Sequence, residues 1–577
     1  MKKKLLPALI VTGLIILVVI IMGITALINK YTPTKKTEDL KEYFNISSDD
    51  EAALIVDNEL SDYKAKIIDK KIYVDYKFVH DSLNSRFYWD ANENVLLYTT
   101  ASDIISAAAD SNSYSVTKQT NDFGYPIVKA TSDSALIALD YVKQYSNITV
   151  KSYDDPARIV ITSKWDEIDS ATVSNSTQIR VKGGIKSPIL KEVKKDDKIT
   201  ILDSGDKWDK VATEDGVIGY IKRKALSESK KTKLTNPDYE EETFTHIKKD
   251  KDICLAWNQV TSQSANSKVP QVISSTKGIN VMSPTWFYLN DNNGNLADIA
   301  SKDYVSYCHS QGIEVWGLFS NLENTDVDAA YVLTHTSTRT TLINQIMSAA
   351  FNYELDGVNI DFENITEAAY GDSYIEFIRE LSIKCHNNGI SLSVDVTVPA
   401  SFNKFFNRSD MANFADYIVI MGYDEHYKGS DAGSVSSIPW VTEGVESTLK
   451  EVPADQIILG MPFYTRIWEL TPKEDDDAVT DTEDQSKYTV ASQVYSMDAA
   501  AAQLATNNAT AALDEESGQN YAEWSVSNKL YKVWLEDSTS LEKRLKIVDD
   551  NKLAGAAFWK LGFENSSVWD TVIKYLD

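Results

Sequence analysis

The chain is poor in positive charge. Of its 577 residues, 58 are Lys or Arg and 85 are Asp or Glu, which gives a formal net charge of −27. This balance argues against a nucleic-acid partner, because binding phosphates needs a basic face. It excludes no neutral sugar as a substrate. The length suffices for three or four domains, and 43% hydrophobic with 25% charged residues is typical of globular domains.

Cysteine and histidine are also scarce. The three cysteines, Cys254, Cys308 and Cys385, lie in apolar or helical stretches without Cys-x-x-Cys spacing. They predict buried thiols rather than a disulfide framework, although one bridge between two of them stays open. The six histidines form no cluster for copper. Acidic residues at 474–477 and 481–484 lack the glycine and spacing of an EF-hand, so they indicate a solvated loop. We expect no metal and no other cofactor.

Only one long hydrophobic run occurs in the sequence. It extends from Leu5 to Ile28, directly after three lysines. At about 1.5 Å per helical residue it spans the hydrocarbon core of a bilayer. A signal peptide has an apolar region of only about 7–15 residues and a small-residue cleavage site, and no such site follows here. We therefore predict that residues 1–30 are an uncleaved single-pass anchor of the cell membrane. The lysines favour a cytoplasmic N-terminus, with the rest of the chain outside the cell.

Residues 31–48 are polar and predict a stalk. In residues 49–165, Lys71–Thr100 and Ala135–Ser163 each run from an apolar segment through a turn into a strand. This repeat resembles the small α+β module at the N-terminus of copper amine oxidases and of many bacterial envelope proteins. The resemblance implies a spacer or a module that faces the cell wall.

Residues 173–227 alternate short strands with Gly and Asp turns, which predicts a small β barrel. Trp208, Asp215-Gly216 and Gly219-Tyr220-Ile221 resemble the end of a bacterial SH3 domain. That resemblance implies binding to cell-wall peptide or glycan, with a structural spacer as the alternative. Residues 228–250 are rich in Lys, Glu, Asp and Thr, which indicates a linker.

Residues 251–577 alternate apolar strand segments with helical patterns. Such a pattern implies a parallel sheet covered by helices on both faces, and eight strands predict a (β/α)8 TIM barrel. The long segment between the seventh and eighth strands predicts an extra subdomain over one side of the cleft. The predicted strands are Ile253–Trp257, Val281–Phe287, Val315–Phe319, Gly357–Phe362, Leu392–Val398, Tyr417–Met421, Ile457–Pro462 and Ala556–Trp559.

The fourth of these strands carries acids at alternate positions. Residues 356–363 read Asp-Gly-Val-Asn-Ile-Asp-Phe-Glu. Side chains on a strand alternate between faces, so Asn359, Asp361 and Glu363 share one face at spacings of roughly 6–7 Å. Burying two carboxyl groups together is costly, which favours a functional reason for them. The alternative is a surface strand with a solvated acidic face.

This segment resembles the signature of family 18 glycoside hydrolases, Asp-x-x-Asp-x-Asp-x-Glu. Asp356, Asp361 and Glu363 fit the signature, whereas Asn359 stands where it has a second acid. The resemblance implies a TIM barrel and a substrate with β-linked N-acetylglucosamine, either chitin or peptidoglycan. Residues 424–427, 438–440 and 460–466 resemble the branch that contains spore cortex-lytic enzymes, which implies peptidoglycan as the substrate. The LysM repeats often attached in that branch are missing here.

The resemblance also implies the chemistry. In family 18 the 2-acetamido oxygen of the sugar attacks its own anomeric carbon, and the configuration is retained. Glu363 would act as acid and then as base, Asp361 would orient the acetamido group, and Tyr423 would donate a hydrogen bond to it. Trp559 would form the floor under the sugar. Asn359 can hydrogen-bond Asp361 but cannot hold negative charge, so we expect an active enzyme with a modified pH profile.

The catalytic prediction is therefore Glu363, Asp361 and Tyr423. Active sites of TIM barrels lie at the carboxyl ends of the strands, and the candidate groups fall at several of those ends. For the tryptophans, packing within the barrel is an equally open interpretation. The predicted substrate-binding residues are Asp356, Asn359, Asp424, Tyr464, Arg466, Trp559, Trp257, Trp286 and Trp440.

Two other functions stay open at this stage. A chitinase or chitooligosaccharide hydrolase would use the same residues on a different glycan. A glycan-binding protein without catalysis is favoured by Asn359 alone. The sequence predicts a polysaccharide partner in each case.

Overall fold

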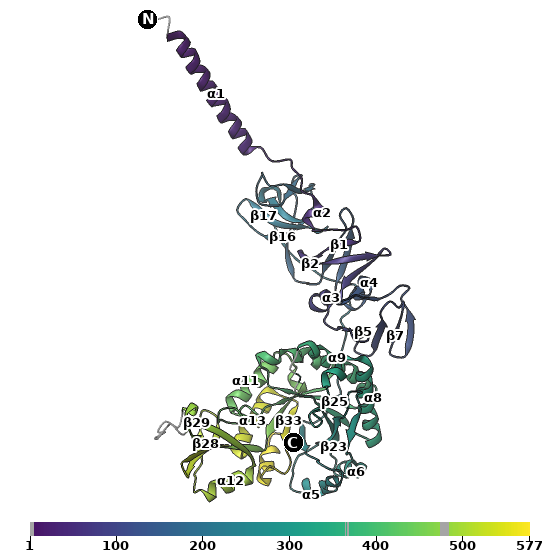
Figure 1. The fold of residues 1–577 in the computed structure, drawn as a ribbon, viewed down its shortest axis with the longest axis vertical. Coiled ribbons are helices and arrows are strands. Elements are labelled where there is room, and N and C mark those ends of the chain that lie inside the picture. Colours follow the sequence, from purple (N-terminus) through teal and green to yellow (C-terminus); the bar gives the residue numbers. More distant parts are fainter. Residues whose placement is uncertain (1–4, 364, 366–367, 474–483, 577) are drawn as a thin grey trace. The chain divides into compact units, whose positions relative to one another are not determined.

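The computed structural model describes residues 5–363, 365, 368–473 and 484–576. Most of the predicted acidic loop, residues 474–483, lies outside them. The chain forms two compact units (Figure 1). The first contains residues 1–89, 107–114 and 120–241, and the second contains 90–106, 115–119 and 242–577.

Helix α1 (Leu5–Tyr31) follows the predicted hydrophobic run. Its large apolar side chains from Leu9 to Ile28 are exposed. It is long and apolar enough to cross a membrane, and a signal sequence near the N-terminus would meet the same criteria. The expected apolar helix is thus present.

A seven-stranded sheet forms one part of the first unit. Its order is β11-β12-β1-β2-β3-β10-β9. The two predicted repeats have the same order of elements, a strand, a helix and a strand pair, in β3-α3-β4-β5 and β10-α4-β11-β12. The bounds are β1 (Glu51–Val56), β2 (Glu59–Ile68), β3 (Lys71–Asp75), α3 (Tyr76–Ser82), β9 (Val128–Ala130), β10 (Ala135–Ala138), α4 (Leu139–Tyr145), β11 (Thr149–Tyr153) and β12 (Arg158–Thr162). A further sheet runs in sequence order through β4 (Phe87–Asp90), β5 (Val95–Thr99), β6 (Ile104–Ala108), β7 (Ser113–Val116) and β8 (Gln119–Asp122).

A second seven-stranded sheet follows, in the order β15-β14-β18-β17-β16-β13-β19. Strand β19 falls within the predicted linker, whose first residues therefore belong to this sheet. The predicted stalk also differs from an extended chain, because it contains α2 (Leu40–Tyr43), and Phe44 is completely buried beside Val173. The strands are β13 (Glu167–Thr172), β14 (Thr177–Arg180), β15 (Ile189–Val193), β16 (Lys198–Asp203), β17 (Trp208–Thr213), β18 (Ile218–Lys222) and β19 (Lys230–Lys233).

The second unit is a TIM barrel, as predicted. Eight strands pair in parallel around a closed ring, β20-β21-β23-β24-β25-β26-β27-β33 and back to β20. Their observed bounds differ from the predicted ones by only a few residues. They are β20 (Ile253–Asn258), β21 (Val281–Leu289), β23 (Glu314–Ser320), β24 (Gly357–Asp361), β25 (Ser391–Thr397), β26 (Tyr417–Met421), β27 (Ile457–Pro462) and β33 (Gly555–Trp559).

Helices cover the outside of the barrel (Figure 1). The large core cluster lies between these helices and the outward-facing strand residues, and the three cysteines are buried free thiols. A separate cluster fills the barrel interior, where Trp316 packs so closely on Gly357 that a Cβ there would lie 2.6 Å from the indole. The helices are α5 (Val269–Val272), α6 (Lys302–Ser310), α7 (Ala329–Thr334), α8 (Thr336–Tyr353), α9 (Ala368–His386), α10 (Arg408–Phe414), α11 (Ile438–Thr448), α13 (Ser538–Asn551) and α14 (Trp569–Val572). The short strand β22 (Leu296–Asp298) pairs with β21.

An extra subdomain lies between β27 and β33, where the sequence predicted one. It is an antiparallel sheet in the order β29-β28-β32-β31-β30. Because β28 begins only two residues after β27 ends, its first side chains stay close to the barrel rim. Its elements are β28 (Tyr464–Pro472), β29 (Tyr488–Ser496), α12 (Met497–Thr506), β30 (Ala512–Asp514), β31 (Gln519–Val526) and β32 (Lys529–Leu535).

Residues 90–106 belong to the second unit and are tied to it by buried polar contacts. Asp90 accepts hydrogen bonds from the backbone N–H of Thr336 at 2.7 Å and from its hydroxyl at 2.6 Å, at the start of α8. Thr99 donates a hydrogen bond to the buried carboxylate of Glu376 on α9. A segment distant in sequence thus completes the surface of α8 and α9.

Candidate active site

Strand β24 has the alternation predicted for it. Val358, Ile360 and Phe362 are buried in the core between strands and helices. Asn359 and Asp361 therefore face the barrel interior. Glu363 follows the strand, and its backbone is held by Asn321, which accepts from the N–H of Glu363 at 2.9 Å and donates to its carbonyl at 2.8 Å. This two-way contact fixes the direction of the Glu363 side chain.

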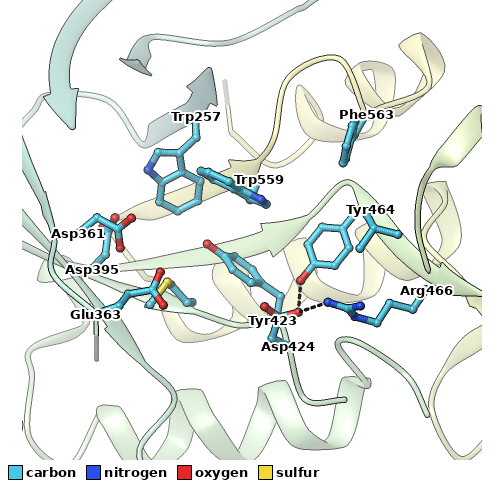
Figure 2. Close-up of a pocket in the computed structure, with 12 residues that line it drawn as sticks. Trp257, Asp361, Glu363, Asp395, Tyr423, Asp424, Tyr464, Arg466, Trp559 and Phe563 are labelled. Carbon is cyan, nitrogen blue, oxygen red and sulfur yellow. Dashed lines mark hydrogen bonds and ion pairs between the residues drawn. The ribbon is translucent and has the colours of Figure 1, made fainter. Parts of the chain in front are cut away.

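A pocket of about 240 Å³ lies at the carboxyl ends of the barrel strands (Figure 2). Asp361 and Glu363 line it together with groups from β20, β25, β26, β28, β29 and β33. In Figure 2 the acids Asp361, Asp395 and Glu363 lie on one side and Arg466 on the other. The complete lining is Trp257, Asp361, Glu363, Asp395, Met421, Tyr423, Asp424, Tyr464, Arg466, Val494, Trp559 and Phe563.

Aromatic side chains form the middle of the pocket. Trp257 makes edge contacts with Trp559 and Tyr423, with ring centroids 6.0 and 6.4 Å apart. Tyr423 fits there because residue 460 is glycine, where a Cβ would lie 3.3 Å from the tyrosine ring. Burial raises the pKa of the Tyr423 hydroxyl well above its ordinary value, so the hydroxyl stays protonated and can donate a hydrogen bond.

Asp424, Tyr464 and Arg466 form the opposite side, which we call the cation wall. The Tyr464 hydroxyl donates to Asp424 at 2.5 Å, and the Arg466 guanidinium lies 3.9 Å from the same carboxylate. Asp424 has a left-handed backbone, with φ at +62°, a conformation that Asp adopts more readily than most residues. The Nε of Arg466 is buried without a hydrogen-bond partner in the part of the chain that is described.

The acids Asp361, Asp395 and Glu363 form what we call the acid wall. Burial, followed by the charges of Glu363 and Glu323, raises the pKa of Asp361 to about 8. Burial, followed by the charges of Asp424 and Glu323, also raises the pKa of Glu363. A carboxyl group in such a place can hold a proton near neutral pH and act as a general acid. Oδ1 of Asp361 is buried and has no hydrogen-bond partner within the described residues.

Asn359 is completely buried below the pocket rather than lining it. Its Oδ1 accepts from the Trp257 indole at 2.9 Å and from Ser283 at 3.0 Å. Its Nδ2 donates to Ser393 at 3.0 Å and to Asp395 at 2.7 Å. The expected hydrogen bond to Asp361 is therefore wrong, because these four contacts use the amide completely.

Three further predicted substrate-binding residues lie away from the pocket. Asp356 precedes β24 at the other end of the barrel, where it contacts His309 and the N–H of Val315, both at 2.8 Å. Trp286 on β21 faces the helices, is completely buried and donates to Asn266. Trp440 lies on α11 and packs against the core between strands and helices. Strand and helix geometry turns both indoles away from the barrel axis.

Sequence reasoning missed four lining residues, Asp395, Met421, Val494 and Phe563. For Asp395 a signal existed, since Ser391, Ser393 and Asp395 alternate along β25 in the same way as Asn359 and Asp361 along β24. Val494 and Phe563 carry no comparable pattern. Among the described residues, no group of three or more His, Cys, Asp or Glu side chains is arranged to hold a metal ion.

Part of the chain is similar to known glycosylases. Residues 324–564 match the family model "Glycosyl hydrolases family 18". The chain is 24% identical over 302 residues to the uncharacterised glycosylase YvbX of Bacillus subtilis, covering 49% of this chain and 81% of that protein. It is 24% identical over 287 residues to the cortical fragment-lytic enzyme of the same organism, covering 48% of this chain and 63% of that one.

A solved structure shows the same fold. The spore cortex-lytic enzyme SleL of Bacillus cereus superimposes with a TM-score of 0.50 at 18% identity, covering 60% of this chain and 79% of that one. Residues 324–564, which include Asp361 and Glu363, therefore form a domain of glycosyl hydrolase family 18, and the chain is a glycoside hydrolase.

Proposed function

We propose that this protein is a membrane-anchored enzyme that cleaves the β-1,4 bonds after N-acetylglucosamine in peptidoglycan, by substrate-assisted catalysis with retention. The observation that carries the proposal is the pair Asp361 and Glu363, two carboxyl groups with raised pKa in a pocket lined by tryptophan. The names of the cortical fragment-lytic relatives favour peptidoglycan as the glycan.

Glu363 is the general acid and base of the proposed reaction. Its protonated carboxyl group donates to the glycosidic oxygen as the bond to the anomeric carbon breaks, and the leaving sugar takes that proton. The acetamido oxygen of the same sugar forms the new bond to the anomeric carbon, which gives a cyclic oxazolinium ion. Glu363, now ionised, takes a proton from the incoming water, whose oxygen opens the ring and restores the acetamido group.

Asp361 and Tyr423 hold the acetamido group in place. The unpartnered Oδ1 of Asp361 is a ready acceptor for the acetamido N–H, and an ionised Asp361 stabilises the positive charge that develops on that nitrogen. The protonated Tyr423 hydroxyl donates to the acetamido oxygen. Orienting the internal nucleophile in this way replaces a carboxylate nucleophile of the protein.

The remaining lining residues bind the sugar. Trp559 presents the apolar surface on which one face of a sugar ring packs, and the buried Trp257 supports it through an edge contact. On the cation wall, Arg466 and Asp424 offer charged hydrogen-bonding groups to the sugar hydroxyls. The size of the pocket, about 240 Å³, suits one sugar unit at the bond that is cut.

Helix α1 supports an anchor in the cell membrane, with the lysines before it cytoplasmic and the catalytic unit outside, next to the wall. Residues 49–165 and 173–227 are proposed as an amine-oxidase-like spacer and an SH3-like module that contacts wall peptide or glycan, and both are rich in strands. Protease added to intact cells should remove the catalytic unit while a cytoplasmic marker survives. Protection of the catalytic unit would contradict this orientation.

The choice between peptidoglycan and chitin is tested by comparing two substrates on the full chain in detergent. Glycan strands of peptidoglycan and soluble N-acetylglucosamine oligomers are supplied at equal concentrations of sugar, and kcat/KM is measured for each. A preference for the peptidoglycan strands supports the proposal. A preference for the oligomers supports a chitooligosaccharide hydrolase, and tight binding without cleavage of either supports a glycan-binding protein.

A further inference from the structure

The acid wall contains a buried acid with no role in the reaction described above. Asp395 is 3% exposed and lines the pocket from β25. In the parallel pairing of β24 with β25, Asn359 lies opposite Ser393. Two residues further along both strands, Asp361 comes to lie across from Asp395 on the same interior face. Neighbouring strands are about 4.8 Å apart, so the two carboxyl groups are neighbours, as Figure 2 also shows.

The orientation of the Asn359 amide is fixed by its neighbours. The Trp257 indole can only donate, so the atom of Asn359 that faces it must be the oxygen. The amide nitrogen must then face Asp395 and Ser393. Asn359 therefore contacts Oδ1 of Asp395 as a donor and does not occupy the second carboxyl oxygen.

The charges around Asp395 favour its protonated form. The charges of Asp361 on β24 and of Glu363, which follows β24, raise the pKa of Asp395, and the charge of Asp395 raises the pKa of Tyr374 on α9 and of Tyr423 after β26. No ion pair joins a Lys or Arg to Asp395 or Asp361 in the described parts of the chain. Glu323 and Asp424 add further negative charge beside Glu363. Two adjacent buried carboxyl groups without a cation do not both ionise, so one of them keeps a proton.

We propose that Asp395 is a positioning residue, which stays protonated and donates its proton to Asp361 in a hydrogen bond that favours the ionised form of Asp361 and aims it at the acetamido group. Burial and the charge of Asp361 raise the pKa of Asp395 well above its ordinary value, in agreement with this assignment. The inference rests on the proposed function. The family 18 signature has an acid where this chain has Asn359 on β24. Under this inference Asp395, on the neighbouring strand β25, supplies the acid that is missing there.

The test removes the donor and compares the result with a matched control. Asp395→Ala takes away the hydrogen bond to Asp361 and one acceptor of the Asn359 amide. Ser393→Ala takes away the other acceptor of the same amide group and leaves Asp361 untouched. Asp395→Asn keeps a donor that can face Asp361. The full chain is used throughout, with kcat, KM and the pH profile of kcat as readouts and the melting temperature as a check on folding.

A donor to the ionised form of Asp361 lowers its pKa, so losing that donor raises the pKa. In Asp395→Ala, kcat should fall about 100-fold with KM within about threefold, and the acidic limb of the profile should move to higher pH. Asp395→Asn should keep the acidic limb of the wild type and a kcat within about tenfold of it. Ser393→Ala should change kcat less than about threefold without moving the limb.

Other results overturn the inference. An unchanged acidic limb in Asp395→Ala would show that Asp395 gives nothing to Asp361, as would equal losses in Asp395→Ala and Ser393→Ala. An equal loss of kcat in Asp395→Asn and Asp395→Ala would show that residue 395 does not act as a hydrogen-bond donor to Asp361. If Asp395→Ala does not fold, the isosteric Asn359→Asp decides the question. The new carboxylate should accept the proton of Asp395 in place of Asp361, so the acidic limb of the pH profile of kcat should move to higher pH. An acidic limb that does not move would contradict the inference.

A separate variant distinguishes this failure from failure of the proposed function. Full activity in Glu363→Gln would refute the reaction itself. An inactive Glu363→Gln together with an unaffected Asp395→Ala would refute only the role of Asp395.

Discussion

Asp395 and Asp424 are both acids at the same pocket, on opposite walls, and their partners differ completely. Asp424 accepts from the Tyr464 hydroxyl and lies near the Arg466 guanidinium. Asp395 has an amide donor and the neighbouring acids of the acid wall, with no ion pair to Lys or Arg among the described residues. Asp424, beside a cation, is placed to recognise polar groups, whereas an acid buried among acids holds a proton.

The position of positive charge separates the functions of the two walls of the pocket. Arg466 stands on one wall only, so the protons that the reaction needs collect on the other wall, around Asp361 and Glu363. The apolar rings of Trp257 and Trp559 lie between the walls and lower the local dielectric, which strengthens both effects. The predictions below test each wall separately.

The largest effect is expected from Glu363→Gln on the acid wall. Glutamine keeps the size of the side chain but cannot transfer a proton, so kcat should fall by about 10³-fold or more with a nearly unchanged KM. Steady-state rates on a soluble N-acetylglucosamine substrate measure this. A loss below tenfold would mean that another group supplies the proton.

Asp361→Asn should lower kcat by about 10²–10³-fold, because the developing positive charge loses its partner. The same variant should be more stable than the wild type at pH 8. The folded-state pKa of Asp361, about 8, is raised above that of the unfolded chain, so the wild type loses stability as pH rises from about 4 to about 8.

Asparagine does not ionise and avoids that loss. Melting temperatures at pH 5 and pH 8 should therefore show a larger gain for Asp361→Asn at pH 8. An equal gain at both values of pH would contradict the protonation assigned to the acid wall.

On the cation wall, Arg466→Lys should raise KM by about tenfold and lower kcat less. Lysine keeps the charge but loses the planar fork that holds several hydrogen bonds at once. The acidic limb of the pH profile should stay where it is in the wild type, since Arg466 does not contact Asp361. Movement of that limb would show that the two walls are not independent.

The substitution Glu323→Gln removes a negative charge near the acid wall and keeps the size of the side chain. Glu323 accepts a hydrogen bond from Ser320, and its charge raises the pKa of both Asp361 and Glu363. Removing the charge should lower the pKa of Glu363, so the acid form is lost at lower pH and the basic limb of kcat/KM moves down by about half a unit. The rate at the optimum should change less than about threefold. A basic limb that moves upward would contradict the cause assigned here.

The smallest effect on catalysis is expected from Asp90, an acid outside both walls. Asp90→Ala removes the side chain that accepts the first N–H of α8 and should destabilise the protein by about 1–2 kcal/mol. The pH profile and kcat should stay the same below the unfolding transition. Chemical denaturation at fixed pH measures the first effect, and a changed pH profile would link this remote segment to the pocket.

Much of the barrel and half of the site could be predicted from local pattern. Apolar runs of strand length predict the eight barrel strands. The alternation of side chains between the two faces of a strand predicts that Asp361 and Glu363 share one side, and both line the pocket. Residues that follow strand ends, such as Tyr423 and Arg466, could also be predicted, because parallel strands of a barrel deliver their carboxyl ends to one rim.

What could not be predicted depends on contacts between distant segments. The partners of Asn359 come from β20, β21 and β25, and the register between strands is invisible in a local pattern. Trp257 and Trp286 are both tryptophans on barrel strands, but only Trp257 faces inward. Asp356 belongs to the matched signature but lies at the opposite end of β24 from Asp361, where it joins β23 and α6 instead of binding sugar.

The most direct test of the account is the digestion of purified peptidoglycan by the full chain, with Glu363→Gln as the control. The released fragments are reduced with borohydride, and mass spectrometry identifies the sugar at each reducing end. The account predicts fragments that end in reduced N-acetylglucosamine and are absent with Glu363→Gln. Fragments that end in reduced N-acetylmuramic acid, or equal release by Glu363→Gln, would contradict it.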